Sequence, residues 1–174
     1  MRQAVFFDRD GTLMEEVKYC ADPSQVRVFP GVPEALRALK DAGFLNIAVS
    51  NQSGIGRGFF GEAQYHAVQR ELLRQIGEGL IDASYFCPDT PDASSTCRKP
   101  EPGMLLEAAR DFGISLARSV MVGDKSSDIE CARRAGTRSI LVATGYGLSQ
   151  TCDPDFRASG VPEAADWVLR HLLP

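Results

Sequence analysis

The chain has 174 residues, of which 44% are hydrophobic and 24% are charged. These values match ordinary globular proteins and exclude disordered, collagen-like and coiled-coil chains, while the length suits one domain with a sizeable core. The 19 Lys and Arg residues against 23 Asp and Glu residues leave a net charge of −4. A mildly acidic chain without a basic run is not expected to bind nucleic acid or an anionic membrane.

The apolar stretch near the start of the chain, residues 4–7, is too short for the core of a signal peptide. No other stretch approaches the roughly 20 apolar residues of a membrane span, so we expect a soluble, cytoplasmic protein. The five cysteines are odd in number and irregularly spaced, which argues against a disulfide framework and fits a reducing compartment. These cysteines are Cys20, Cys87, Cys97, Cys131 and Cys152.

Short hydrophobic runs alternate with segments of helical periodicity, which is the pattern of βαβ units and a parallel sheet. In chain order, the sequence predicts a strand at 3–7, a helix between 31 and 43, a strand at 44–49, a helix at 62–76, a strand at 83–86, a helix at 103–112, a strand at 119–122, a helix at 127–135, a strand at 139–142 and a helix at 162–172. Since each helix follows a strand, right-handed crossovers predict an α/β fold with one doubly wound parallel sheet.

Two of the predicted connections, residues 11–30 and 87–102, are long for such a fold. Loops of this length in a compact domain are usually functional or disordered. Neither can hold a second folded domain, so we expect residues 1–174 to form a single domain without a separate cap.

Two carboxylates, Asp8 and Asp10, stand where the first predicted strand ends. On an extended backbone this spacing puts both on one side, at the carboxyl edge where α/β sheets bind their ligands. Two like charges so close favour a cation between them, and Mg²⁺ prefers oxygen ligands. The alternative interpretation is a solvated turn, because Asp and Gly are common in turns.

Two further acids, Asp124 and Asp128, follow the fourth predicted strand and open a helix. We expect Ser126 or Ser127 to cap this helix while the acids point over the sheet edge towards the first pair. Alternatively, Asp128 only complements the helix dipole.

The ends of the second and third strands carry groups that suit a phosphate. Hydroxyl and amide side chains occupy residues 50–53, although an ordinary polar turn explains them equally well. Arg98 and Lys99 enter the same edge from the third loop, and fixed cations assist phosphoryl transfer. Surface cations are usually only solvated, so the prediction depends on four strand ends that each carry a suitable group.

Residues 56–61 match the dinucleotide-binding pattern G-x-G-x-x-G. The first glycine, however, comes six residues after Ser50, where the strand ends, whereas the fingerprint needs it in the strand-to-helix turn. We interpret this segment as a flexible loop from which Arg57 reaches a substrate.

Together these segments resemble the four motifs of the haloacid dehalogenase (HAD) superfamily of phosphatases. The matching residues are 7–12, 50–54, 98–100 and 123–125. The residues within these motifs are similar to those of the capless, histidinol-phosphatase-like branch of the superfamily. The resemblance extends from Phe6 to about Ala135. It implies a Rossmann-like HAD core and a Mg²⁺-dependent sugar-phosphate phosphatase with a small-molecule substrate, acting as a monomer.

The resemblance implies a chemical role for each acid. Asp8 would be the nucleophile that forms an aspartyl-phosphate. Asp10 would protonate the leaving oxygen and later take a proton from water. Asp8, the backbone carbonyl of Asp10 and Asp124 would hold Mg²⁺, with Asp128 as an outer partner.

The resemblance also implies how the substrate is held. Ser50 and Lys99 would stabilise the transferring phosphoryl oxygens, while Arg98 and Lys125 would recognise a distant part of the substrate, such as a second phosphate. The residues expected to line the pocket are Glu16, Val17, Lys18, Tyr19, Asn51, Gln52 and Ser53.

A structural zinc ion in the third loop is not expected. A closed zinc site needs four Cys or His ligands, and this loop offers only Cys87 and Cys97, with Asp89 as a third ligand at most. Members of the family commonly carry Cys-x-His and Cys-x-Cys there, and this chain has Asp89 and Ser95 at two of those positions.

Other hypotheses explain part of the pattern. A receiver domain also combines clustered acids, Mg²⁺, a hydroxyl group and a lysine, but its acceptor acid ends the third strand, where this chain has Cys87. A non-catalytic sugar-phosphate binder is conceivable, although no catalytic position is missing. Within the phosphatases, histidinol phosphate is the nearest alternative substrate.

Overall fold

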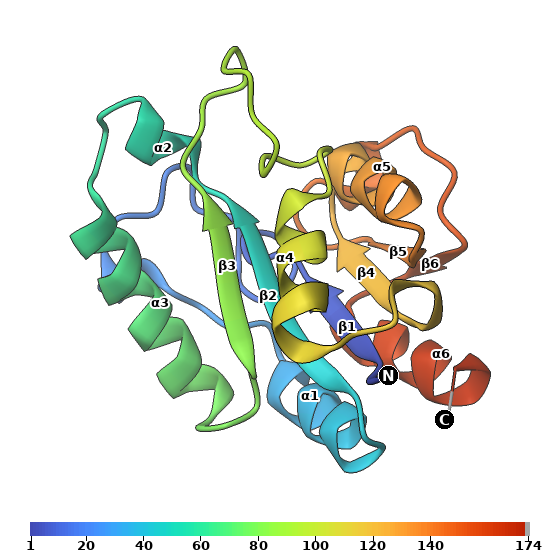
Figure 1. Ribbon diagram of the computed structural model, residues 1–174. Coiled ribbons are helices and arrows are strands. Elements are labelled where there is room, and N and C mark those ends of the chain that lie inside the picture. The colour runs from blue at the N-terminus through green and yellow to red at the C-terminus, as the bar shows by residue number, and fades with distance from the viewer. Residues whose placement is uncertain (173–174) are drawn as a thin grey trace.

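The protein, described by a computed structural model over residues 1–172, contains a six-stranded sheet in the order β3-β2-β1-β4-β5-β6 (Figure 1). Every neighbouring pair of strands is parallel. The strands are β1 (Ala4–Phe7), β2 (Leu45–Asn51), β3 (Ala83–Cys87), β4 (Val120–Gly123), β5 (Arg138–Val142) and β6 (Phe156–Ala158). The helices are α1 (Val32–Asp41), α2 (Ser53–Gly56), α3 (Glu62–Ile76), α4 (Gly103–Phe112), α5 (Ser126–Ala135) and α6 (Val161–His171). This is the doubly wound α/β fold that the sequence predicts.

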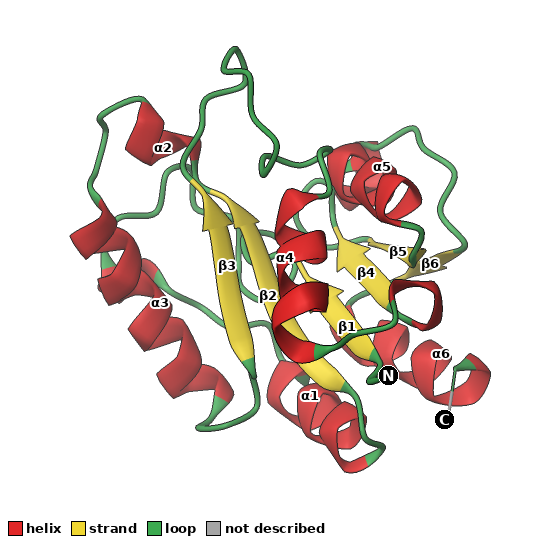
Figure 2. Cartoon of the chain, in the orientation of Figure 1, coloured by secondary structure: helices red, strands yellow, loops and turns green. Residues whose placement is uncertain are grey.

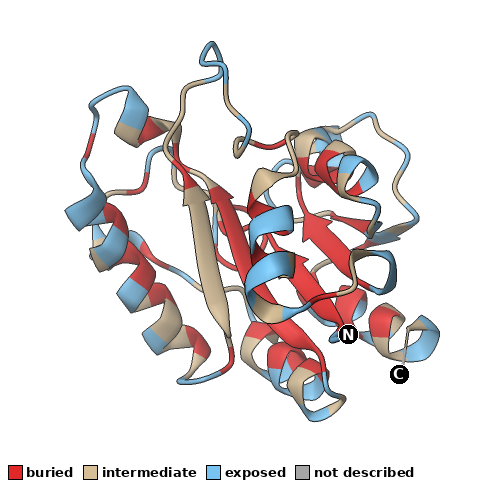
Figure 3. Ribbon diagram, in the orientation of Figure 1, coloured by how far each residue is buried: buried red, intermediate tan, exposed pale blue. Residues whose placement is uncertain are grey.

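The alternation of side chains along β1 divides the core into two layers. Ala4 and Phe6 pack with α4 and α5, whereas Val5 and Phe7 pack with α1, α3 and α6. Because both faces of the sheet are covered, the central strands are apolar throughout, as parallel sheets usually are. Figure 3 shows these strands buried, with the exposed residues on the outer sides of the helices.

The strand ends place the polar loops together. Figure 2 shows that the loops following β1, β2, β3 and β4 leave the sheet at the same edge, and the long loop after β3 lies above it. In the register of the sheet, Phe7 of β1 pairs with both Ala48 and Val122. Asp8 therefore begins the loop at the centre of this edge.

All ten predicted elements are present, with ends that match or differ by at most two residues. The strand β2 continues to Asn51, so Ser50 and Asn51 lie within a strand and not in a turn. The sequence does not predict two short elements, the helix α2 with four residues and the strand β6 with three. Segments so short contain little more than one repeat of helical or strand periodicity, too little to show a pattern.

The expected serine cap of α5 is wrong. The N-cap position belongs to Lys125, and its backbone N–H donates to Asp128 Oδ2 at 3.1 Å. The acid thus satisfies a free backbone group of the first turn, as acidic side chains near a helix N-terminus commonly do.

The sequence argues against disulfide bonds, and this expectation is wrong for one pair of cysteines. Cys87 and Cys97 form a disulfide, because the loop after β3 turns back and brings their Cα atoms to 5.7 Å. Cys20, Cys131 and Cys152 are free. Within residues 1–172, no helix has the length and apolar character needed to cross a membrane, and no separate cap domain is present.

Candidate active site

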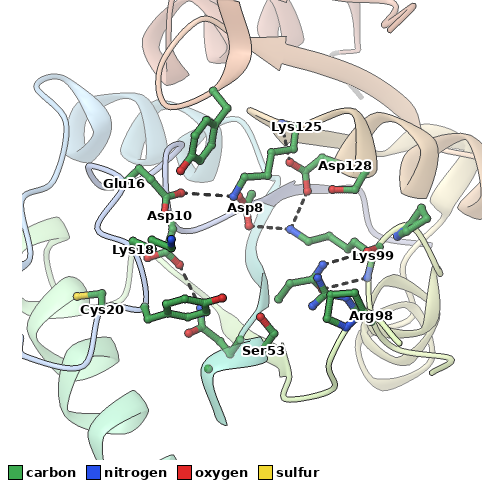
Figure 4. Close-up of a pocket in the computed structure, with 18 of the residues that line it drawn as sticks. Asp8, Asp10, Glu16, Lys18, Cys20, Ser53, Arg98, Lys99, Lys125 and Asp128 are labelled. Carbon is green, nitrogen blue, oxygen red and sulfur yellow. Dashed lines mark hydrogen bonds and ion pairs between the residues drawn. The ribbon is translucent and has the colours of Figure 1, made fainter. Parts of the chain in front are cut away.

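A cleft of about 680 Å³ opens at the carboxyl edge of the sheet. Its walls come from the loops after β1, β2, β3, β4 and β5. Among its lining residues are Asp8, Asp10, Glu16, Val17, Lys18, Tyr19, Asn51, Gln52, Ser53, Arg98, Lys99, Lys125 and Asp128. The acids and cations that follow three separate strands, β1, β3 and β4, therefore share one cavity, and Figure 4 shows most of them facing it.

A buried lysine joins two of the acids. Lys99 Nζ lies 2.7 Å from Asp8 Oδ1 and 2.7 Å from Asp128 Oδ1, and all three side chains are almost fully buried (Figure 4). The ammonium also donates to the carbonyl of Val49 at 3.0 Å. This lysine thus acts as the fixed counter-charge of the cleft floor.

The pKa values at this centre follow from its charges. Burial alone would raise the pKa of Asp8, but the nearby Lys99 and Lys125 lower it below the usual range, so the carboxylate is ionised. Burial would lower the pKa of Lys99, yet Asp128 and Asp8 raise it. Burial and the charge of Asp8 raise the pKa of Asp128 despite the lysine.

The strand β4 supplies a second buried carboxylate, Asp124. Its Oδ2 accepts a hydrogen bond from the backbone N–H of Tyr146 at 2.8 Å, while Oδ1 has no partner among the described residues. Burial, followed by the charge of Asp8, raises the pKa of Asp124 to about 8. A Cβ atom at Gly11 or Gly145 would collide with this carboxylate, so glycine is required at both positions.

These acids form a set of oxygen ligands that fits a hard divalent cation. The carboxylates of Asp8, Asp124 and Asp128 each offer an oxygen within 4.8 Å of the others. A cation would supply a partner for the unpaired Oδ1 of Asp124 and would oppose the rise of its pKa, which burial and then the charge of Asp8 cause. The donor set is all oxygen, which suits Mg²⁺.

The side chain of Asn51 holds the backbone of Lys99 in place. Its Nδ2 donates to the carbonyl of Lys99 and its Oδ1 accepts from the N–H of Lys99, both at 3.0 Å. The side chain of Asn51 is therefore engaged by the protein, although it also lines the cleft.

Asp10 lies beside this centre, with its carboxylate held from two sides. Arg9 donates from Nε to Asp10 Oδ2 at 2.9 Å and from its NH2 group to Oδ1 at 3.2 Å. Gln52 Nε2 donates to Asp10 Oδ2 at 3.1 Å and to Ser50 Oγ at 2.5 Å. Ser50 is buried and does not form part of the cleft lining.

The outer part of the cleft is more exposed. Lys125 Nζ lies 3.3 Å from Glu16 Oε2 and 5.0 Å from the ring centre of Tyr146. Burial raises the pKa of Glu16 even though Lys125 opposes the shift. Tyr19, whose φ is +54°, packs against Phe59 with ring centres 4.8 Å apart.

The loop after β3 turns Arg98 into the cleft. The backbone N–H of Arg98 donates to Ser95 Oγ at 3.0 Å, and its NH1 group donates to the carbonyl of Asp89 at 3.1 Å. Burial and the neighbouring Arg57 lower the pKa of Arg98. A cation with no carboxylate partner within residues 1–172 suits an anionic ligand.

Every expected residue except Arg57 lies at the cleft or directly behind it, and the two behind it, Ser50 and Asp124, are buried and do not line it. Arg57 follows the last residue of α2, is exposed and does not line the cleft, because the unexpected helix ends just before it. Two residues outside the expectations contribute, Arg9 and Tyr146. Arg9 could have been found from the sequence, because it stands between the two acids Asp8 and Asp10. Nothing in the sequence indicates that Tyr146 contributes.

The donor set of the third loop does not fit a closed zinc site. Cys87 and Cys97 are bonded to each other, and Asp89 and Ser95 supply no nitrogen or sulfur ligand. That no zinc binds stays a prediction.

Comparison with known proteins identifies the family. Residues 96–173 match the HAD-hydrolase-like family model. The chain is 41% identical to D-glycero-D-manno-heptose-1,7-bisphosphate 7-phosphatase of Thermosynechococcus vestitus, over 99% of this chain and 98% of that protein. It is 39% identical to the D-glycero-beta-D-manno-heptose-1,7-bisphosphate 7-phosphatase of Yersinia pestis, over 97% and 90%.

The solved structures agree with this result. The chain is similar to D,D-heptose 1,7-bisphosphate phosphatase of B. bronchiseptica, in complex with magnesium and phosphate, with a TM-score of 0.88 and 32% identity over 98% of this chain and 99% of that one. The cleft geometry, the sequence relatives and this fold together show that the chain belongs to the HAD phosphatases and is a phosphoric monoester hydrolase.

Proposed function

We propose that this protein is a Mg²⁺-dependent phosphatase that removes the C7 phosphate of D-glycero-D-manno-heptose 1,7-bisphosphate through an aspartyl-phosphate. The observation that carries the proposal is the buried, ionised carboxylate of Asp8, held 2.7 Å from Lys99 Nζ on the floor of an open cleft. The names of the relatives support the choice of substrate.

The first step transfers the phosphoryl group to the enzyme. An oxygen of Asp8 attacks phosphorus, the bond from phosphorus to the sugar oxygen breaks, and Asp10 gives a proton to that oxygen. Lys99 stabilises the charge on the phosphoryl oxygens, and Ser50, buried behind the cleft lining, supports Gln52 at its edge. The depressed pKa of Asp8 supports its role, because only the carboxylate form is nucleophilic.

The second step releases phosphate. A water molecule attacks the phosphorus of the aspartyl-phosphate while Asp10 takes its proton, and the bond between Asp8 and phosphorus breaks. Both acids then return to their starting states. One hard displacement is thus divided into two easier ones.

The acids at the ends of β1 and β4 would hold the metal ion. Asp8, the backbone carbonyl of Asp10 and Asp124 are the proposed ligands, and Asp128 would lie outside them, paired with Lys99. When bound, Mg²⁺ would neutralise the carboxylates and the phosphoryl oxygens they face.

A second phosphate on the substrate suits the outer part of the cleft. Arg98 has no carboxylate partner among the described residues, and Lys125 has only a partly exposed one. Histidinol phosphate has a single phosphate and would leave Arg98 unused. This difference favours the bisphosphate, and Arg57 lies close enough to Arg98 to add positive charge there.

Phosphate release with Mg²⁺ from both heptose bisphosphate anomers, histidinol phosphate and simple sugar monophosphates tests the proposal. We expect the highest kcat/KM for a bisphosphate anomer. Broad, weak activity would reject the substrate and keep the phosphatase. We further propose that the enzyme acts as a cytoplasmic monomer that supplies heptose for lipopolysaccharide.

A further inference from the structure

Arg9 is a buried cation that has no role in the two proposed steps, phosphoryl transfer to Asp8 and release of phosphate. Its side chain is 1% exposed and does not line the cleft, although it lies between Asp8 and Asp10 in the sequence. The guanidinium lies 5.4 Å from the ring centre of Tyr65, a buried residue of α3. Arg9 therefore reaches the cleft only through the residue that follows it.

The contacts of Arg9 fix the carboxylate of Asp10 in one rotation. Two parallel hydrogen bonds, 2.9 Å to Oδ2 and 3.2 Å to Oδ1, match the planar fork of the guanidinium. Gln52 adds a second hydrogen bond to Oδ2 at 3.1 Å. Since a carboxylate oxygen accepts about two hydrogen bonds, Oδ2 is saturated and Oδ1 keeps one free position.

Stability alone does not explain this arrangement. Burying a guanidinium costs free energy unless all its groups are paired, and NH1 of Arg9 has no partner in residues 1–172. Burial lowers the pKa of Arg9, but Asp10 raises it by more, so the side chain stays charged. An apolar side chain against Tyr65 would avoid the unpaired group.

We propose that Arg9 is the positioning residue of the acid–base carboxylate: its fork holds Asp10 so that Oδ1 is the oxygen that gives and takes the proton. This inference rests on the proposed two-step function. It predicts that Arg9 acts on proton transfer to the leaving oxygen and leaves substrate binding unchanged.

The leaving group provides the test. A sugar alkoxide must receive a proton from Asp10 as its bond to phosphorus breaks, whereas p-nitrophenolate is stable without one. Loss of the positioned acid should therefore slow the first step for a sugar phosphate and spare it for p-nitrophenyl phosphate. Positioned general acids contribute about 10²–10⁴-fold, of which orientation is one part.

The experiment measures the first turnover of Arg9→Met on heptose bisphosphate and on p-nitrophenyl phosphate, both with Mg²⁺. We expect the sugar-phosphate rate to fall about 10–100-fold with KM within about twofold of wild type, and the p-nitrophenol burst to keep its rate. Arg9→Lys keeps the charge without the fork, so it should recover only part of the loss.

Two controls separate positioning from folding. Val68→Ala removes buried volume from α3, three residues after Tyr65, so it should lower thermal stability without changing the ratio of the two rates. In an Asp10→Asn background, Arg9→Met should cause no further loss on the sugar phosphate, because the group that Arg9 positions is gone.

The other outcomes reject the inference. Equal loss on both substrates would make Arg9 a structural residue, and unchanged rates on both would make it dispensable. If Arg9→Met does not fold, the same comparison with Arg9→Lys decides. Inactive wild type on every substrate would instead reject the proposed function, which keeps the two failures distinct.

Discussion

The inner and outer parts of the cleft are built in different ways. The inner centre consists of Asp8, Lys99, Asp124 and Asp128. The outer rim consists of Glu16, Tyr19, Arg98, Lys125 and Tyr146. Every residue of the inner centre is at most 5% exposed, whereas Tyr19 and Tyr146 of the rim are 38% and 45% exposed.

This contrast suggests that the inner centre carries out the reaction and that the rim selects the substrate. Asp8 and Asp124 directly follow strand ends, and Lys99 joins Asp8 and Asp128 through short ion pairs in a buried environment, where charge interactions are strong. The rim side chains come from loops, and their ion pair at 3.3 Å is partly exposed to water. Changes to the inner centre should therefore affect turnover, and changes to the rim should affect affinity.

The largest effect is expected for Asp8→Asn. The amide cannot attack phosphorus, so turnover should fall on the order of 10⁴–10⁶-fold, as when other enzymes lose their nucleophile. Phosphate release and a thermal melt measure activity and folding. Asp41→Asn, an exposed acid at the end of α1, is the matched control and should keep full activity. Substantial turnover by Asp8→Asn would contradict the inner centre as the reaction site.

Asp124 should make the stability of the metal-free protein depend on pH. Because its pKa is raised from 3.8 to about 8 in the folded state, the folded protein binds more protons, and this stabilisation is lost as pH rises through about 8. Relative to Asp124→Asn, wild type should lose on the order of 3–5 kcal/mol of unfolding free energy between pH 4 and pH 8.

Urea unfolding of the metal-free proteins at several pH values measures this difference. Added Mg²⁺ should stabilise wild type more at pH 8 than at pH 6 and should stabilise Asp124→Asn less. Parallel pH curves for the two proteins would show that the Asp124 carboxylate is not perturbed.

Arg98→Gln should change affinity more than turnover. A hydrogen bond to a charged group is worth about 1.5–3 kcal/mol, so KM for the bisphosphate should rise about 10–100-fold with kcat nearly unchanged. A sugar monophosphate should show little change. Arg74→Gln, on the exposed side of α3 and paired with Glu71, is the control. An equal effect on both substrates would argue against contact with the second phosphate.

The smallest effect is expected for Glu16→Gln. Removing the carboxylate frees Lys125 from a partly exposed ion pair, whose contribution to stability is at most about 1 kcal/mol. We expect KM for an anionic substrate to fall about two- to fivefold, and added salt to reduce the difference. A higher KM would mean that Glu16 itself binds the substrate.

The sequence predicts the fold and the inner centre well, for a physical reason. Runs of four to six apolar residues have strand periodicity, and acids directly after β1 and β4 must lie at the shared carboxyl edge of a parallel sheet. The placement of Asp8 and Asp124 thus depends on local pattern and topology alone.

The remaining features depend on contacts between distant parts of the chain. The hydrogen bonds of Asn51 to Lys99 and the approach of Tyr146 to Asp124 join loops that follow different strands. The burial of Arg9 depends on Tyr65 of α3, and the pairing of Cys87 with Cys97 depends on how one loop turns. No local periodicity encodes such contacts.

The paired hydrogen bonds between Asn51 and the backbone of Lys99 have a consequence for how this enzyme can change. An amide side chain presents the same donor and acceptor as a peptide group, so Asn51 of β2 pairs with the backbone of Lys99 as a peptide group of a neighbouring strand would. The lysine is therefore anchored to the sheet, independently of the loop that leads to it. A change in the stretch between Cys87 and Lys99 would therefore leave this anchor in place, so that new contacts with a substrate can arise there while Lys99 keeps its position.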